Sequence, residues 1–165
     1  MMVEDQAGQP RAEPAIRPAR AEDCEGVARL VGALGSPGGV QEVAERLLEI
    51  DGASGHQVLV AEDPDGGGVV GWIHVFAAPR LTVATFAEIG GLVVDESLRG
   101  RGIGRLLVSA ALAWAEQRGL TTLRVRSRVE RAGAHRFYRR LGFGATKQQE
   151  VLEVAVASGG MDRAS

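Results

Sequence analysis

One short stretch constrains this chain more than any other: LRGRGIGRLL, Leu98 to Leu107, which holds three glycines and three arginines. Apolar residues recur at helical spacing from Ile103 to Trp114, so the stretch predicts a tight turn that runs directly into an amphipathic helix. The first backbone N–H groups of a helix have no intrahelical partner and carry partial positive charge. Glycines let an anion approach these groups closely, and arginines add charge. The turn therefore predicts a diphosphate site at the end of a strand.

Two common phosphate-binding motifs do not fit this turn. The Walker motif needs Gly-Lys-Ser/Thr after its glycines, and no such sequence follows here. The dinucleotide-binding glycines follow the first strand of a βαβ unit, whereas this turn comes after a hairpin and a further strand, deep in the chain. A connection that simply needs the backbone freedom of glycine stays open as an alternative.

The chain before the turn predicts two helices and then three strands. Apolar residues at helical spacing indicate amphipathic helices over 27–34 and 40–48, the second ending at Asp51-Gly52. The runs QVLVAE and VVGWIHVF flank the turn DPDGGG and predict a hairpin. A third strand is expected from Thr85 to Asp95, where the pair Gly90-Gly91 indicates a bulge or a close approach to the main chain.

The chain after the turn adds a strand, a helix and a last strand. The expected elements are a helix closed by Arg118-Gly119, a strand at TTLRVRS, a short helix over 134–141 ended by Gly142, and a strand at VLEVAV. With IRPA as a short first strand, this order predicts the α/β class with a mixed sheet.

Size and charge limit the class of protein. A chain of 165 residues can bury one sizeable core, so one domain is expected over 14–156, with a disordered tail at 1–13 and a flexible tail at 157–165. The net charge of −2 argues against nucleic acid as the partner. The single Cys24 excludes an internal disulfide and a multi-cysteine metal site, and no metal is expected. Neither a membrane-spanning run nor a signal peptide is present, so the cytoplasm is the expected compartment.

Two motifs together resemble one family. The stretch Arg99 to Gly104 matches the Arg/Gln-x-x-Gly-x-Gly/Ala signature of the GNAT superfamily of N-acetyltransferases, and it follows the strand IGGLVVD. The later AHRFYRRLGF is similar to the second motif of that family. The resemblance covers residues 15 to 156 and implies the GNAT fold: a mixed sheet of about six or seven strands, about four flanking helices and a V-shaped cofactor slot where the bulged strand splays from its neighbour.

The resemblance also implies a cofactor and the residues that hold it. The cofactor is acetyl-CoA, whose pyrophosphate would lie on backbone amides of the turn while its pantetheine arm pairs with the preceding strand. The implied cofactor-binding residues are Leu92, Val93, Val94, Arg99, Gly100, Arg101, Gly102, Ile103, Gly104 and Arg105. The implied activity is transfer of the acetyl group to a primary amine of a small molecule.

Acetyl transfer to an amine needs a neutral amine, donors for the developing oxyanion and a proton for the departing thiolate. The resemblance implies Glu88 as the general base, and His74, which shares a strand face with Trp72 by alternation, is the rival. Tyr138, in the second motif, would protonate the thiolate. Each of the three also fits a purely structural role. A backbone amide near Val93 or Val94 would donate to the oxyanion.

The remaining features leave the acceptor open. Direct attack needs no cysteine nucleophile, so Cys24 is expected to be a packing residue. Arg131 stands where many family members carry an asparagine that contacts the cofactor, which puts that contact in doubt. The form R-x-x-A-H-x-F-Y is similar to branches that acetylate small amines, aminoglycosides and aminoalkylphosphonates among them. The acids Glu42, Glu45, Glu49 and Asp51 either line a cleft or form a solvated helix face.

Two other functions fit the same motifs. One is a peptide or protein N-terminal acetyltransferase, and the other is a non-catalytic acyl-CoA sensor. A homodimer is common in the family, and nothing in the sequence requires one.

Overall fold

The computed structural model describes residues 12–35 and 38–157. They fall into two compact units: the first ends at Arg128, and the second begins at Val129. Most of the two predicted tails, and part of the SPGG break between the first two helices, lie outside the described residues.

The helices and strands of the first unit follow one another in the predicted order. Its strands are β1 (Ala15–Pro18), β2 (His56–Glu62), β3 (Val69–Ala78), β4 (Phe86–Val94) and β5 (Leu123–Val125). Its α-helices are α1 (Cys24–Ala33), α2 (Val40–Gly52) and α3 (Ile103–Gln117), with short 3₁₀ turns η1 (Ala21–Asp23) and η2 (Glu96–Leu98).

The strands form one sheet in chain order, β1-β2-β3-β4-β5. The first four are antiparallel to their neighbours, and β5 is parallel to β4. This confirms the α/β class with a mixed sheet and the predicted hairpin. The prediction of six or seven strands is wrong, because the described residues form five.

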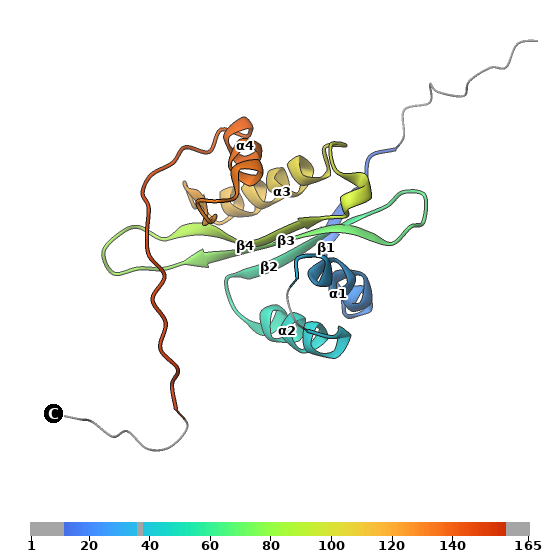
Figure 1. Ribbon diagram of the computed structural model, residues 1–165, viewed down its shortest axis with the longest axis horizontal. Coiled ribbons are helices and arrows are strands. Elements are labelled where there is room, and N and C mark those ends of the chain that lie inside the picture. The colour runs from blue at the N-terminus through green and yellow to red at the C-terminus, as the bar shows by residue number, and fades with distance from the viewer. Residues whose placement is uncertain (1–11, 36–37, 158–165) are drawn as a thin grey trace, which may run out of the picture. The chain divides into compact units, whose positions relative to one another are not determined.

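Helices cover both faces of this sheet, as Figure 1 shows. Helices α1 and α2 pack on one face around Val27, Leu30 and Val43, with Trp72 of β3 against them. Helix α3 lies on the other face, where Gly71 allows a close approach. A Cβ at Gly71 would lie 3.1 Å from Leu107 Cδ1 and 3.0 Å from the Val93 carbonyl oxygen. The sheet is therefore buried between two layers of helices.

A left-handed glycine directly follows the C-terminal end of α3 but not that of α2. Gly119 takes a φ of 71° just after α3, as the sequence predicts, because a left-handed residue lets the last carbonyls of a helix be paired. Helix α2 ends at Gly52, as predicted, but the left-handed conformation expected there is absent. Gly52 is the last residue of α2, the following Ala53 is extended, and the left-handed glycine is Gly55.

The second unit contains one helix, α4 (Ala132–Arg140). It ends before Gly142, whose φ of 93° confirms the predicted stop. Phe137, Tyr138 and Phe143 form an edge-to-face cluster, with ring centroids 5.1 and 5.3 Å apart for successive pairs. The predicted strand at VLEVAV is wrong, because residues 144–157 have neither helical nor strand structure.

No helix in the described part of the chain is long and apolar enough to cross a membrane.

Candidate active site

Strand β4 changes its pairing at its midpoint. Val75 of β3 faces Ile89, and the preceding His74 faces Gly91, so Gly90 is an extra residue without a partner on β3. This confirms the predicted bulge. On its other side, β4 pairs with β5 only from Ala87 to Ile89. The half of β4 beyond the bulge therefore has an edge that β5 does not cover, which is what the splayed slot of the predicted fold requires.

Two glycines allow the side chains of β3 to lie against this bulge. A Cβ at Gly90 would lie 2.7 Å from His74 Nδ1, and a Cβ at Gly91 would lie 2.8 Å from Trp72 Cη2. Real Cβ atoms do not approach other atoms so closely, so any larger residue would force a shift. The pair Gly90-Gly91 thus marks a close approach as well as a bulge.

The strand leads into the glycine-arginine turn. Gly100 and Gly102 have φ values of 79° and 81°, in the left-handed region that favours glycine, and neither has a heavy atom within 4 Å of its Cβ position. Gly102 is the N-cap of α3, and no side chain caps the helix there. The first intrahelical bond runs from the Leu106 N–H to the Gly102 carbonyl. The N–H groups of residues 103–105 therefore have no acceptor within the helix.

Asp95 holds the start of this turn in place. Its N–H donates to the Val70 carbonyl at 2.8 Å, and its carboxylate accepts from Ser97 N–H at 3.1 Å and from Arg29 Nη1 at 2.8 Å. Arg29 also donates to the Val69 carbonyl. These bonds, and Arg29 above all, hold the pKa of Asp95 below its usual value. The turn is thereby tied to α1 and to β3.

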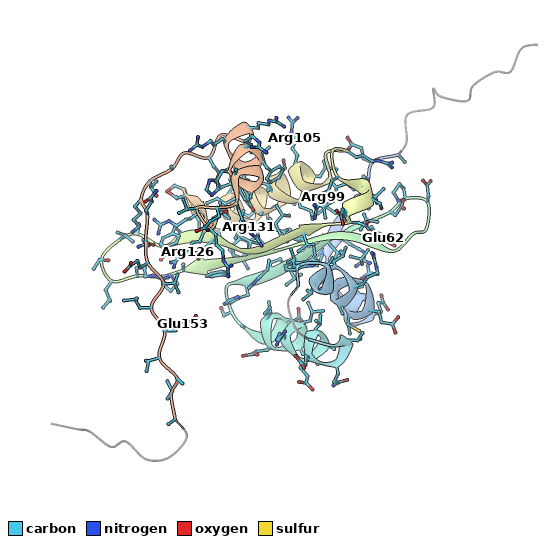
Figure 2. The ribbon with its side chains drawn as sticks, in the orientation of Figure 1. Glu62, Arg99, Arg105, Arg126, Arg131 and Glu153 are labelled. Atoms are coloured by element: carbon cyan, nitrogen blue, oxygen red, sulfur yellow. The ribbon has the colours of Figure 1, made fainter. Side chains whose placement is uncertain are left out.

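The turn and the start of α3 carry several arginines, of which Arg99 and Arg105 are labelled in Figure 2. Arg99, Arg101 and Arg105 are exposed. Arg101 and Arg105 line a cavity of about 600 Å³ that Asp63 and Asp65 of the β2–β3 turn also line. That cavity carries charges of both signs, so the arginines alone do not make it an anion site.

Glu88 lies on β4 opposite Arg124, one residue before the last position at which β4 pairs with β5. It is 7% exposed, yet only one of its carboxylate oxygens has a partner: Oε1 lies 3.1 Å from Arg126 Nε. The other oxygen, Oε2, is buried without a hydrogen-bond partner. Arg126, labelled in Figure 2, follows β5 and pairs with this carboxylate. A carboxylate with one unsatisfied oxygen is suited to accept a proton or a hydrogen bond from a ligand.

His74 forms part of a histidine pair. Its Nε2 lies 3.0 Å from Nδ1 of His56 on β2, so one ring donates a hydrogen and the other accepts it. Burial, and then the neighbouring His56, lower the pKa of His74. The neutral ring, which can accept a proton, is therefore favoured at neutral pH. The strand register places His74 and Trp72 on the same face, as predicted.

Tyr138 belongs to the second unit, on α4. Burial raises its pKa to about 12, against a smaller opposing effect of Arg131. The hydroxyl thus keeps its proton throughout the neutral range and can donate a hydrogen bond. Arg131 is the N-cap of α4 and makes no side-chain cap.

The structure brings several predicted site residues together. Glu88, the bulge, residues 92–94 and the turn 99–105 all lie along β4 and its continuation into α3. Sequence reasoning missed Arg126 and His56. Arg126 shares a strand alternation with Arg124 in RVRS, which was an available signal, whereas His56 becomes relevant only through strand pairing. Among the described residues, no group of three His, Cys, Asp or Glu side chains could hold a metal ion.

Similarity to solved structures supports this fold assignment. A transcriptional regulator from Bacillus halodurans C-125 superposes with a TM-score of 0.76 at 26% identity, covering 86% of this chain and 99% of that one. Glucosamine-6-phosphate N-acetyltransferase from Arabidopsis thaliana gives a TM-score of 0.73, covering 86% of this chain and 98% of that one, and its 22% identity supports the fold alone.

Sequence similarity identifies the family. A curated protein described as an uncharacterized N-acetyltransferase of Methanocaldococcus jannaschii is 42% identical over 67 residues, which are 41% of this chain and 28% of that protein. The chain thus matches little more than a quarter of that relative. The model of the acetyltransferase (GNAT) family matches residues 32–143, which include α3, β4 and α4. The chain therefore belongs to the acetyltransferase (GNAT) family.

Proposed function

We propose that the protein transfers the acetyl group of acetyl-CoA to a primary amine of a small molecule by direct attack. The observation that carries this proposal is the half of β4 that β5 leaves unpaired, which leads through η2 and the glycine turn to the uncapped N-terminus of α3. An extended arm that ends in a diphosphate fits such an edge followed by such a turn.

The residues present fit this cofactor. The open Cβ positions of Gly100 and Gly102 leave the turn accessible, so a pyrophosphate can approach the amides from Arg99 to Arg105. Residues 92–94 would pair with the pantetheine arm along the edge that β5 leaves free. The exposed side chains of Arg99, Arg101 and Arg105 add neutralising charge. When bound, acetyl-CoA supplies a thioester carbonyl for attack by the amine.

Glu88 would act as the general base. The nitrogen of a protonated amine cannot attack a carbonyl, so the proton must leave before or during attack, and Glu88 Oε2 is an unpartnered acceptor for it. The ion pair with Arg126 holds Oε1 in place and leaves Oε2 for the substrate. His74 remains the rival base, because its neutral ring is favoured by burial.

Tyr138 would donate to the departing thiolate. A hydroxyl with a pKa of about 12 carries its proton at every pH at which such an assay is run. Tyr138→Phe should therefore lower kcat without changing the alkaline limb of the rate profile, and a variant with full kcat and a normal fold would remove this role. A backbone amide near Val93 or Val94 would donate to the oxyanion.

The proposal is tested by measuring free thiol released from acetyl-CoA with a panel of amines. The panel holds monoamines, polyamines, aminoglycosides, amino acids and short peptides with free N-termini. Thiol release with a small amine supports the proposal, and preference for peptides would favour an N-terminal acetyltransferase. If acetyl-CoA raises the Tm but no amine releases thiol, the chain is an acyl-CoA-binding protein without this activity.

A further inference from the structure

A row of flat side chains crosses the sheet next to Glu88. The strand register pairs His56 of β2 with Phe76 of β3, and Phe76 with Glu88 of β4, so the three side chains share one face. His56 and Phe76 are stacked, with ring centroids 5.2 Å apart and an interplanar angle of 14°. His74 lies within 5.3 and 5.4 Å of these two rings. We call His56, His74 and Phe76 the aromatic shelf.

The shelf ends at the bulge on one side. A Cβ at Gly90 would lie 2.7 Å from His74 Nδ1 and 3.3 Å from Phe76 Cε1, so the bare backbone of the bulge borders the rings. Glu88 stands at the same end, nine-tenths buried, with Oε2 free of hydrogen-bond partners. A buried carboxylate oxygen without a partner is costly unless a ligand donates to it.

The shelf meets a cavity on the other side. His56 lines a cavity of about 140 Å³ between β2 and α2. Most of its other lining is apolar, including Ala19, Ala21, Cys24, Ala44, Leu47 and Val58. Arg20 and Asp51 are its charged members. The acids Glu42, Glu45 and Glu49 on α2 are exposed and do not line it.

We propose that the acceptor is a monoamine with a flat apolar body, bound with its nitrogen at Glu88 Oε2, its body on the aromatic shelf and its far end toward the apolar cavity. This inference rests on the proposed function and narrows its substrate class. Neighbouring strands lie about 4.8 Å apart, so the row from Glu88 to His56 spans about 10 Å. That length suits an arylalkylamine with a few methylene groups between ring and nitrogen.

The charges of the site oppose a polycation. The carboxylate available on this face is shared with Arg126, which leaves one oxygen for one ammonium group. A second positive charge on the acceptor would lie over the rings of His56 and His74. An imidazole is either neutral or positively charged, so these rings supply no negative charge to pair with it. A ring, in contrast, stacks favourably on Phe76 and His56.

The test compares acceptors by kcat/KM in the thiol-release assay. The probes are 4-phenylbutylamine, n-butylamine and spermidine. We expect 4-phenylbutylamine to exceed both others by roughly tenfold or more, since burial of a ring discriminates by about that factor. Two variants should lower the ratio of 4-phenylbutylamine to n-butylamine: Phe76→Leu removes the flat stacking surface, and Ala44→Phe fills the cavity.

A matched variant controls for the added ring. Ala113 is exposed on α3, on the opposite face of the sheet, so Ala113→Phe should leave the ratio unchanged. The inference is wrong, and the proposed function stands, if spermidine or an aminoglycoside is the best acceptor. The same holds if Phe76→Leu and Ala44→Phe leave the ratio of 4-phenylbutylamine to n-butylamine unchanged.

A binding measurement separates the two failures. If no amine releases thiol, the proposed function fails, and the acceptor site is tested directly by titrating 4-phenylbutylamine while observing the ring nitrogens of His56 and His74 by NMR. Saturable shifts of these signals, absent in Ala44→Phe and retained in Ala113→Phe, support the site. Signals that do not move overturn it.

Discussion

Two carboxylates in the first unit are buried to the same degree and bonded very differently. Asp23, in η1, is 6% exposed and Glu88 is 7% exposed. Asp23 accepts from Arg17 Nη1 and Nη2 at 2.7 and 2.8 Å and from the Arg20 N–H at 2.7 Å. Glu88 has one partner on one oxygen. Equal burial therefore does not mean an equal role.

The difference separates a structural carboxylate from a ligand-binding one. A buried charge is stable when every lone pair that faces the protein is used, and Asp23 meets that condition. Its bonds to Arg17 hold the pKa of Asp23 below its usual value and tie η1 to β1. Glu88 leaves an acceptor unused at the end of the aromatic shelf. We expect the first site to govern stability and the second to govern activity.

The largest expected effect is on catalysis. Glu88→Gln keeps the shape of the side chain and removes the proton acceptor, so kcat should fall by about 10²- to 10⁴-fold, the usual contribution of a general base. The free energy of unfolding should change little, because Oε2 makes no hydrogen bond that the substitution would remove and the remaining amide oxygen can still accept from Arg126. Thiol-release kinetics and urea unfolding measure the two quantities. Full activity in Glu88→Gln would transfer the base to His74 or to water.

The next effect is on stability alone. Asp23→Asn should cost about 3 kcal/mol of unfolding free energy, because the largely buried Arg17 loses the more buried of its two carboxylate partners. Glu62→Gln is the control: Glu62 also pairs with Arg17, at 2.7 Å, but it is half-exposed, so the cost should be less than about 1 kcal/mol. Each variant should keep its kcat per folded molecule. A loss of kcat in Asp23→Asn at full folding would contradict the separation of roles.

The bulge gives a mixed effect. Gly90→Ala forces His74 aside, and overpacking of this kind typically costs about 1–3 kcal/mol. Activity should fall as well, because the shelf must shift. Gly32→Ala, an open helix position, should be neutral or slightly stabilising. If Gly90→Ala were as stable as the wild type, the close approach to His74 would not constrain the chain.

The pH dependence distinguishes Asp23 further. Since its pKa is lowered on folding, its contribution is complete above the unfolded value of about 3.9 and is lost as the pH falls through the folded value. Below about pH 4, the stability gap between the wild type and Asp23→Asn should narrow by at most about 1.4 kcal/mol per pH unit. Chemical unfolding at stepped pH measures the gap. A gap that is constant down to pH 2 would refute the assignment.

The smallest effect concerns Arg126. This arginine is half-exposed, so Arg126→Met should change stability by less than about 1 kcal/mol. It should lower kcat by less than Glu88→Gln does, because Glu88 Oε1 loses the partner that holds it in place. Arg128→Met, two residues on and exposed, is the matched control. A kcat equal to that of the wild type would show that Arg126 does not position the base.

Much of the fold was predictable because local signals decided it. The helices, the hairpin and the bulge follow from apolar spacing and from glycines that act within a few residues. The strand predicted at VLEVAV was wrong because alternating Val and Leu indicate only that a segment fits a pleated surface, and the pattern does not determine whether the segment pairs with another strand. Helix α2 ends at the predicted Gly52, but Gly55 is the residue that takes the left-handed conformation.

The site was predictable where one segment carries it. Glu88, the bulge and the turn lie close together along the chain, so the resemblance to the family assigns them a role from one segment. The His56–His74 contact spans 18 positions, and the pair Arg126–Glu88 joins β4 to the residue that follows β5. Such contacts depend on strand register, which a one-residue change would alter completely. No local pattern contains that information.

The extra residue at Gly90 also changes which residues of β4 share a face of the sheet. Alternation counted from Glu88 would put Gly90, Leu92 and Val94 beside it, but the bulge adds one step, so Gly91 and Val93 take that face. The strand has a different parity on each side of Gly90. Deletion of Gly90 would restore uniform alternation and would leave Ile89, Leu92 and Val93 opposite their present partners on β3. It would therefore remove the bulge without exchanging the two faces of the strand.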